Sequence, residues 1–238
     1  MPDPAFNTPD TLKSMTAPDC QVQSVNVGQP SALHIGPRPQ VSGIDKRPLP
    51  GRVRVSVDGL AGDHVVDTEH HGGPDQAVYI YTHEDYAHWE AELGRSLPPG
   101  IFGENLLVRG LESAAMRVGD QLNIGGPGGV RLEVTAPRIP CAKLAAHVGQ
   151  PTLVKQFVAV GRPGFYTRVL RGGEVGPGDH VQLTPGPTDA PSIRDLFELW
   201  YDPAPDLAKL ERYLEFPVAV RVRARMQQLT DRHGALSP

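Results

Sequence analysis

The chain has 238 residues, of which 39% are hydrophobic and 21% are charged. At about 150 residues per domain, this length predicts one large domain with a small appendage, and the apolar content is sufficient for a buried core. The formal net charge of −4 disfavours a general electrostatic attraction to nucleic acid or to an acidic membrane surface. The sequence has no run of about 18 apolar residues, so we expect a cytoplasmic protein without a membrane span.

The 26 glycines and 25 prolines predict many turns and short strands rather than long helices. The two cysteines, Cys20 and Cys141, are too few for a disulfide framework or a cysteine-rich zinc site, which indicates a reducing compartment. Cys20 ends a polar segment with several prolines, residues 1–20, which we expect to be a disordered tail. We interpret Cys20 as incidental and Cys141 as a candidate for chemistry.

The valines of segment 22–27 mark the start of the folded part, and the proline-rich segment 36–51 is predicted to be a loop. Apolar and polar residues alternate from 53 to 57, which is typical of a half-buried strand. A second strand is expected at 77–81. A helix then begins at Thr82, with an acidic residue three positions further on as a weak capping box.

The middle of the chain predicts mainly β-structure. Strands are expected at residues 106–108, 121–124, 130–135, 165–170 and 180–183, and one helix at 152–160. Short strands at uneven spacing, separated by glycine turns, favour a β-barrel. The predicted fold class is therefore mainly β (α+β), a β-barrel with peripheral helices over residues 21–186.

The composition changes at the Pro-Gly-Pro segment 185–187, which separates the barrel from a helical part. Three apolar stripes with helical spacing follow, at Ile193, Leu196, Phe197 and Trp200, at Leu207, Leu210 and Leu214, and at Val218, Val222, Met226 and Leu229. We predict a small three-helix C-terminal domain over residues 187–238.

The first segment with candidate chemistry is His71-Gly72-Gly73-Pro74-Asp75-Gln76. Two glycines beside a proline form a tight turn whose backbone amides can point at one spot and bind an anion. The histidine adds a switchable proton donor. An ordinary solvated turn explains the same residues equally well, because Gly-Pro turns are common.

The second segment, Gly103-Glu104-Asn105, places polar groups just before a predicted strand. Taken alone it is an ordinary turn with an asparagine that bonds its own backbone.

The third segment places Cys141 after Pro140, where a helix is expected to begin, between Arg138 and Lys143. A helix N-terminus and two cations all favour the thiolate, which is a nucleophile or a soft metal ligand. Most free cysteines are small buried hydrophobes, and here the cations and prolines argue modestly against that interpretation. Seven cations could surround one anionic pocket, although most are expected on solvated faces, namely Lys46, Arg47, Arg52, Arg138, Lys143, Arg162 and Arg168.

Six segments in the same order resemble the MOSC domain, named for the C-terminal domain of molybdenum-cofactor sulfurase. They are Lys46 in its proline-rich loop and the segments 59–63, 71–75, 102–106, 118–120 and 137–141. The helical tail resembles the three-helix domain of YiiM-like MOSC proteins, so the resemblance covers about residues 25–232. One departure is Gln76, where the family pattern often has a basic residue.

The resemblance implies a MOSC β-barrel that binds the molybdenum cofactor, a molybdenum-pterin (molybdopterin), without pyridoxal phosphate. It places the metal ligand at Cys141 and the two turns around the cofactor pocket. The cofactor-binding residues it implies are Lys46, His71, Gly72, Gly73, Asp75, Gln76, Gly103, Glu104, Asn105, Arg138 and Lys143. YiiM-like proteins are associated with reduction of N-hydroxylated compounds such as hydroxylaminopurine. This implies a molybdenum-dependent oxidoreductase, with Cys141 and His71 as catalytic residues.

Two other functions stay open. A non-catalytic carrier or sensor of the cofactor would use the same pocket. A cysteine-dependent hydrolase would pair Cys141 with His71 or with His147, but His147 lies about a turn and a half further along the expected helix.

A reductase of this kind needs a separate electron-donor protein, because two cysteines cannot hold an iron–sulfur cluster and no flavin or haem signal is present. The other expected partner is the small N-hydroxylated substrate, with neither nucleic acid nor membrane. The three-helix domain could cover a barrel opening, dock the electron donor or form a homodimer.

Overall fold

The computed structural model describes residues 20–35, 38–68 and 71–234. The expected tail therefore lies outside the described residues, apart from its last residue. Cys20 is only 3% exposed and belongs to the barrel core, so this residue is part of the fold and not of the expected tail. Its carbonyl accepts a hydrogen bond from the Val181 amide at 2.9 Å, which ties the start of the fold to its far end.

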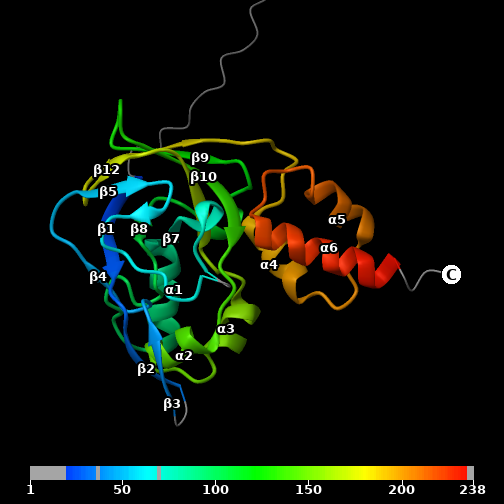
Figure 1. Ribbon diagram of the computed structural model, residues 1–238, viewed down its shortest axis with the longest axis horizontal. Helices are drawn as coiled ribbons and strands as arrows, with labels where there is room; N and C mark the ends of the chain where they lie inside the picture. The colour runs from blue at the N-terminus through cyan, green and yellow to red at the C-terminus, as the bar shows by residue number, and fades with distance from the viewer. Residues whose placement is uncertain (1–19, 36–37, 69–70, 235–238) are drawn as a thin grey trace, which may run out of the picture.

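An eight-stranded sheet forms the body of the molecule (Figure 1). Its strand order is β13 (Val181–Thr184), β9 (Gln121–Ile124), β10 (Val130–Pro137), β11 (Phe165–Arg171), β7 (Val78–Thr82), β8 (Leu106–Arg109), β1 (Gln21–Gly28) and β4 (Lys46–Pro48). Neighbours are antiparallel except β7 and β8. A bridge between Gln21 and His180 joins β1 to the segment before β13, so the sheet closes on itself and the predicted barrel is confirmed.

Two small sheets flank the barrel. One consists of β12 (Gly173–Val175), β5 (Val53–Ser56) and β6 (Gly59–Leu60), and the other is the hairpin of β2 (Ser31–Ile35) and β3 (Arg38–Ser42). The prediction of a loop over 36–51 was wrong, because β3 and β4 lie within it. Prolines are tolerated there because β3 and β4 are edge strands, where a missing amide donor breaks no ladder.

Strand β7 lies between two hydrophobic cores, one inside the barrel and one between the barrel and the helices. Its side chains alternate: Val78 and Ile80 pack inside the barrel, whereas Tyr79 and Tyr81 pack outside against helices. The outer helices are α1 (His83–Leu93), α2 (Ala142–Val148) and α3 (Leu153–Val160). Thr82 caps α1 as predicted, by accepting the Asp85 amide. The outer face of β7 is thereby fixed in position beside the candidate site.

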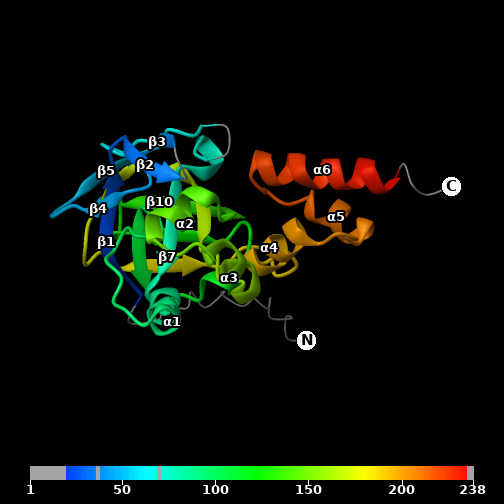
Figure 2. The ribbon, with the colours of Figure 1, turned by 90° about the horizontal axis from the view of Figure 1, so that it is seen from below.

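The C-terminal part consists of α4 (Ile193–Tyr201), α5 (Leu207–Tyr213) and α6 (Val220–Gly234), as the apolar stripes predict. These helices lie to one side of the barrel in two perpendicular views (Figures 1 and 2). Their inner residues Leu210, Val222 and Met226 join the same core as α2 and α3. None of the helices in the described ranges is both long and apolar enough to cross a membrane.

Candidate functional site

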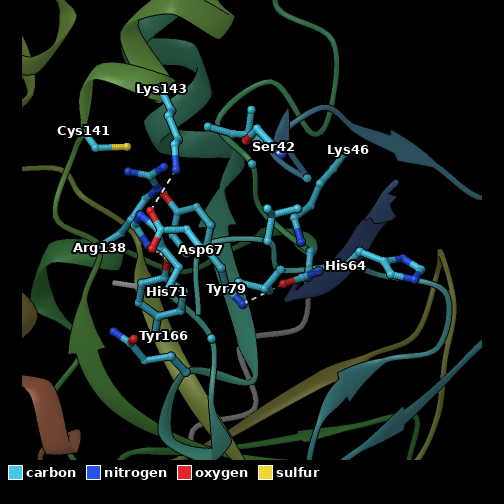
Figure 3. A pocket seen from close by; sticks show the side chains of 18 of the residues that line it. Ser42, Lys46, His64, Asp67, His71, Tyr79, Arg138, Cys141, Lys143 and Tyr166 are labelled. Atoms are coloured by element: carbon cyan, nitrogen blue, oxygen red, sulfur yellow. Dashed lines mark hydrogen bonds and ion pairs between the residues drawn. The ribbon is translucent and has the colours of Figure 1, made fainter. Parts of the chain in front are cut away.

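A pocket with two adjoining lobes lies beside strands β7 and β11, and Figure 3 shows residues that line its inner lobe. The inner lobe is narrow, at about 80 Å³, and lies among the loops of the barrel. The second lobe, here called the outer chamber, is about 400 Å³ and reaches the helical domain. Six residues line both lobes, namely Asp67, His71, Gln76, Cys141, Lys143 and Tyr166.

Cys141 stands at the junction of the two lobes because of the chain around it. Strand β10 ends at Pro137, and Pro140 then fixes the backbone before Cys141, which is the N-cap residue of α2. The predicted helix start is confirmed. The thiol is free and partly exposed. A soft sulfur ligand is therefore presented to both lobes at once.

Arg138 is the most informative charge at the site. It is only 4% exposed, and among the described residues no carboxylate lies within ion-pair distance of it. Burial lowers its pKa, but the acidic groups of Tyr166, Tyr79 and Cys141 raise it, and the net shift is upward. Its guanidinium lies 5.6 Å from the centroid of the Tyr79 ring. A buried cation without a carboxylate partner is a ready site for an anion.

His71 faces both lobes and contacts Tyr166, its Nδ1 lying 3.2 Å from the Tyr166 hydroxyl. Burial, together with the charge of Arg138, lowers the His71 pKa to about 3. The imidazole is therefore neutral at neutral pH and offers one N–H rather than a positive charge. An anion bound in the pocket would raise this pKa, because it favours the protonated form.

Lys46 lies on the side of the inner lobe away from Cys141 (Figure 3). Its ammonium is buried and forms an ion pair with Asp63. Asp63 also accepts hydrogen bonds from the Gly28 amide and from Asn105 Nδ2, each at 2.8 Å. Asn105 in turn accepts the Tyr79 amide at 3.0 Å. The triad of Lys46, Asp63 and Asn105 thus locks one wall of the inner lobe to the barrel.

The structure brings most of the sequence-predicted site residues to this pocket. Those that line it are Lys46, His71, Gly72, Gln76, Gly103, Asn105, Arg138, Cys141 and Lys143. Gly73, Asp75 and Glu104 do not line either lobe. Gly72 and Gly73 both have positive φ, at 76° and 84°, as the predicted tight turn requires.

Asp75 belongs to the contact between the barrel and the helical domain. Its carboxylate accepts the Val220 amide at 3.0 Å, at the start of α6, and pairs with Arg168 at 3.0 Å. Gln76 faces α6 as well, because its Oε1 accepts a hydrogen bond from Arg221. A guanidinium from the helical domain therefore lies beside the position where the family pattern often has a basic residue.

We expect Asp75→Ala to lower the free energy of unfolding by about 1 kcal/mol, because the first turn of α6 loses a charged acceptor. Arg168 retains Glu133 at 3.4 Å, so no charge is stranded. Urea unfolding measures the change, with Asp189→Ala, at the exposed pair with Arg212, as the control. Unchanged stability would contradict this role of Asp75.

Glu104 is fully buried behind the pocket wall, where its Oε1 accepts the Tyr86 hydroxyl at 2.5 Å and the Gly100 amide at 2.6 Å. Its Oε2 has no hydrogen-bond partner among the described residues. Burial raises the Glu104 pKa from 4.5 to about 7, although the hydrogen bonds from Tyr86 and Gly100 oppose the shift. The folded protein therefore holds this proton more tightly than the unfolded chain does.

The raised pKa of Glu104 predicts how the free energy of unfolding changes with pH. Between pH 4.5 and about 7, the folded state binds more protons at Glu104, so stability falls as the pH rises through that window. The shift corresponds to a loss of about 3 kcal/mol. Glu104→Gln has no proton to lose, so its unfolding free energy should lack that slope. Urea unfolding of both proteins across the window measures it, and parallel profiles would contradict the assignment.

Four of the seven candidate cations do not line the pocket, in agreement with the expectation that most of them lie elsewhere. Those four pair with carboxylates elsewhere, Arg47 with Asp45, Arg52 with Asp179, Arg162 with Asp85 and Glu112, and Arg168 with Asp75 and Glu133. Lys46, Arg138 and Lys143 do line the pocket, and Lys143 pairs there with Asp67 at 2.8 Å. Spacing along the chain could not separate these groups, because three of the four pair with carboxylates that are distant in the sequence.

Several residues of the pocket escaped the sequence analysis. The rings of Tyr79 and Tyr166 are tilted against each other, with their centroids 5.1 Å apart, and Arg138 lies over the Tyr79 ring. Trp200 and Arg221 reach the outer chamber from the helical domain. Tyrosines that alternate with smaller apolar residues in β7 gave a weak signal for an aromatic outer face. Trp200 was assigned to the apolar stripe of its helix, and it lines the outer chamber from there.

A hydrolase would need a histidine bonded to the cysteine. Among the residues that the structure describes, no hydrogen bond joins Cys141 to a histidine. His147 lines neither lobe. Burial lowers the pKa of its imidazole, and the charged groups that act on it are Asp45 and Arg47. The described residues also hold no cluster of three His, Cys, Asp or Glu side chains able to bind a metal by itself. A thiol flanked by cations suits a metal that is already coordinated by other ligands and that carries anionic groups.

Comparison with known proteins gives consistent results. The family model of the MOSC domain matches residues 67–182. The Bacillus subtilis protein YflK is 35% identical over 89% of this chain and 95% of its own length. A Gibberella moniliformis protein named "Reductase" is 34% identical over 61% of this chain but only 26% of its own length. The crystal structure of YiiM from Geobacillus stearothermophilus superposes with a TM-score of 0.72 at 30% identity, covering 88% of this chain and 98% of that one.

Proposed function

Because this chain belongs to the MOSC family of YiiM-like proteins, we propose that it binds a molybdenum-pterin cofactor and reduces N-hydroxylated small molecules. The observation that carries the proposal is the buried Arg138, which has no carboxylate within ion-pair distance among the described residues and lies beside the free thiol of Cys141. The cofactor has a phosphate and an anionic metal-oxo centre, and it needs cations and a soft ligand. The residues of the pocket fit both needs.

Each part of the pocket has a task in this proposal. Cys141 would hold the metal through its thiolate, at the junction of the two lobes. Arg138, Lys46 and Lys143 would supply positive charge to the anionic groups. Gly72 and Gly103 let the two turns pack closely against Val65 and Ile44, because a Cβ at either position would lie within 3.1 Å of those side chains. When bound, the cofactor supplies two-electron redox chemistry and accepts an oxygen atom.

The reaction consumes two electrons and two protons: R–NH–OH becomes R–NH2, and the N–O bond breaks with release of water. The hydrogen bond between His71 and the Tyr166 hydroxyl offers a path for protons from the outer chamber to the reacting group. Because the anionic cofactor would raise the His71 pKa, His71 would donate a proton as the imidazolium and regain it from solvent. The electrons would come from a separate reductase, because two cysteines cannot hold an iron–sulfur cluster. The fungal relative named "Reductase" supports redox chemistry in such proteins.

The test is to purify the protein from a host that makes the cofactor. Molybdenum is measured by elemental mass spectrometry and pterin by fluorescence, and 6-hydroxylaminopurine is supplied with reduced methyl viologen. We expect stoichiometric molybdenum and pterin, and conversion to adenine. Bound cofactor without turnover would indicate a carrier or sensor instead, and folded protein without molybdenum or pterin would refute the proposal.

A further inference from the structure

A second hollow lies beside the outer chamber, between α3 and α4, and the last turn of α4 contributes to both. Trp200 lines the outer chamber, whereas its neighbours Leu199 and Tyr201 line the hollow. Helices α3 and α4 lie side by side in both views of the ribbon (Figures 1 and 2). The hollow, here called the docking hollow, has a volume of about 490 Å³, and it shares no lining residue with the two lobes of the candidate site.

Two large apolar side chains are exposed in the docking hollow. Val158 of α3 is 37% exposed and Tyr201 of α4 is 38% exposed. The Tyr201 ring is held in place by Phe197, which meets it edge to face with the ring centroids 5.3 Å apart. A supported aromatic ring beside an exposed valine is typical of a surface that a partner covers.

The rim of the docking hollow is acidic, because four carboxylates and one ammonium line it. Asp195 pairs with the Lys209 ammonium at 3.5 Å and Asp206 caps α5, so both carboxylates have a role within the fold. The other two carboxylates face solvent. Glu198 is 65% exposed and reaches Arg194 only at 4.0 Å, and Asp202 is exposed at the end of α4.

The surrounding segment accounts for the net charge of the whole chain. Residues 189–215 contain seven acidic and three basic residues, and the formal net charge of the chain is −4. A surface of this sign attracts a basic partner and steers its approach. A second copy of the same surface would bring like charges together, which is unfavourable.

Tyr201 connects the docking hollow to the candidate redox site. Burial raises the pKa of the Tyr201 hydroxyl, the charge of Arg138 lowers it, and the charge of Cys141 raises it. Charges are screened over roughly 10 Å, so the hydroxyl lies near both of these residues. Trp200, the preceding residue of α4, lines the outer chamber together with Cys141. A partner seated in the docking hollow is therefore separated from that chamber by the last turn of α4.

We propose that the docking hollow binds the electron donor, a redox protein with a basic face and a projecting apolar side chain. The inference rests on the proposed function, which needs electrons from a separate protein. The apolar side chain packs against Val158 and Tyr201, and the basic groups around it meet Glu198 and Asp202. The donor is oxidised by two electrons, which cross the last turn of α4 to the cofactor site. The N–O bond then takes up these electrons with two protons, as the amine and water form.

Binding is tested by calorimetry at low ionic strength on the cofactor-loaded protein, with ferricytochrome c, a small basic haem protein, as the probe. Glu198→Lys combined with Asp202→Asn should weaken its binding about tenfold, because these rim charges attract the basic face. Glu211→Lys combined with Glu215→Gln is the control. It changes the net charge equally, at exposed residues that do not line the docking hollow, and should keep the affinity within about threefold.

Electron transfer tests whether the docked protein is within reach of the metal. The cofactor-loaded protein is reduced with dithionite, freed of excess reductant and mixed with ferricytochrome c, so that each molecule gives two electrons to two haems. The second-order rate constant should fall about tenfold in the rim variant and also in Tyr201→Ala, which removes the exposed ring. Tyr201→Phe keeps the ring and should stay within about threefold. Ferricyanide, a small oxidant that needs no docking surface, should reoxidise all variants at similar rates.

The outcomes separate the possible occupants of the docking hollow. Equal weakening in the rim variant and its control would overturn the inference, because cytochrome c would then respond only to the overall charge. Loss of molybdenum and pterin in the rim variant would assign the surface to a protein that delivers the cofactor, and dimers of the natural protein that dissociate in this variant would assign it to a second copy. Failure to reduce 6-hydroxylaminopurine with reduced methyl viologen would refute the proposed function, while the calorimetric titration, which needs no turnover, would still decide the docking surface.

Discussion

Protein carrying Cys141→Ser is expected to lose most of its molybdenum and to reduce N-hydroxylated compounds at least about a thousandfold more slowly. Loss of an outer-shell partner alone typically costs 10 to about 100-fold in metal affinity or activity, and loss of a direct ligand costs more. The cause is the chemistry of the side chain. A thiolate is a soft ligand, whereas a serine hydroxyl remains protonated and is a poor ligand for a metal already held by sulfur. Elemental mass spectrometry and an anaerobic assay with reduced methyl viologen measure both effects.

The chain supplies a matched control in its other cysteine. Cys20 lies in the barrel core, so Cys20→Ala should lower stability modestly and leave the molybdenum per folded protein unchanged. Cys141 is partly exposed at the N-cap of α2, where serine is a favourable residue, so Cys141→Ser should fold normally. Full molybdenum content and turnover in Cys141→Ser would exclude the thiol as ligand.

Local patterns predicted the elements of the fold, and the contacts between distant segments explain what they missed. Alternating valines indicated β5, and Pro140 before Cys141 indicated the start of α2. The hairpin of β2 and β3 has strands of only five residues each, and β2 is mostly exposed, so the local signal is weak. Its strands form because they pair with each other, and this pairing is not visible in local composition.

The candidate site was predictable to the extent that its residues occur in short motifs. The motif around Gly103 illustrates the limit, because its neighbour Glu104 turns into the core toward Tyr86 while Asn105 faces the pocket. Asp75 similarly turns toward α6 although its motif neighbour His71 lines both lobes. Which way each side chain points depends on partners more than a hundred residues away for Asp75, and the spacing within a motif does not encode them.

Asp63 is the residue for which we expect the largest effect on stability. Asp63→Asn should lower the free energy of unfolding by about 4 kcal/mol, because it leaves the buried ammonium of Lys46 without its carboxylate. The Lys46 and Asp63 side chains are only 8% and 7% exposed, so water cannot replace the lost partner. Burial already lowers the Lys46 pKa from 10.5, and Asp63 opposes that shift, so the variant should lower it further.

The lowered pKa of Lys46 fixes how the free energy of unfolding changes with pH. A lysine whose folded pKa is below its unfolded value binds fewer protons in the folded state, so stability rises with pH up to about 10.5. The deficit of Asp63→Asn should therefore shrink as the pH is raised toward 10, and urea unfolding at a series of pH values measures it. The double variant Lys46→Met with Asp63→Asn should recover part of the loss, because the stranded charge is gone.

The exposed ion pair of Arg47 and Asp45 is the matched control for this experiment. Its side chains are 73% and 36% exposed, so Asp45→Asn should change stability by less than about 0.5 kcal/mol at any of these pH values. If Asp63→Asn lowers the free energy of unfolding as little as Asp45→Asn does, the buried ammonium of Lys46 does not need its carboxylate partner. The hydrogen bonds of Asn105 alone would then hold the wall of the inner lobe. A large loss confined to Asp63→Asn and relieved at high pH would identify the buried pair as the element that fixes Lys46 at the anion site.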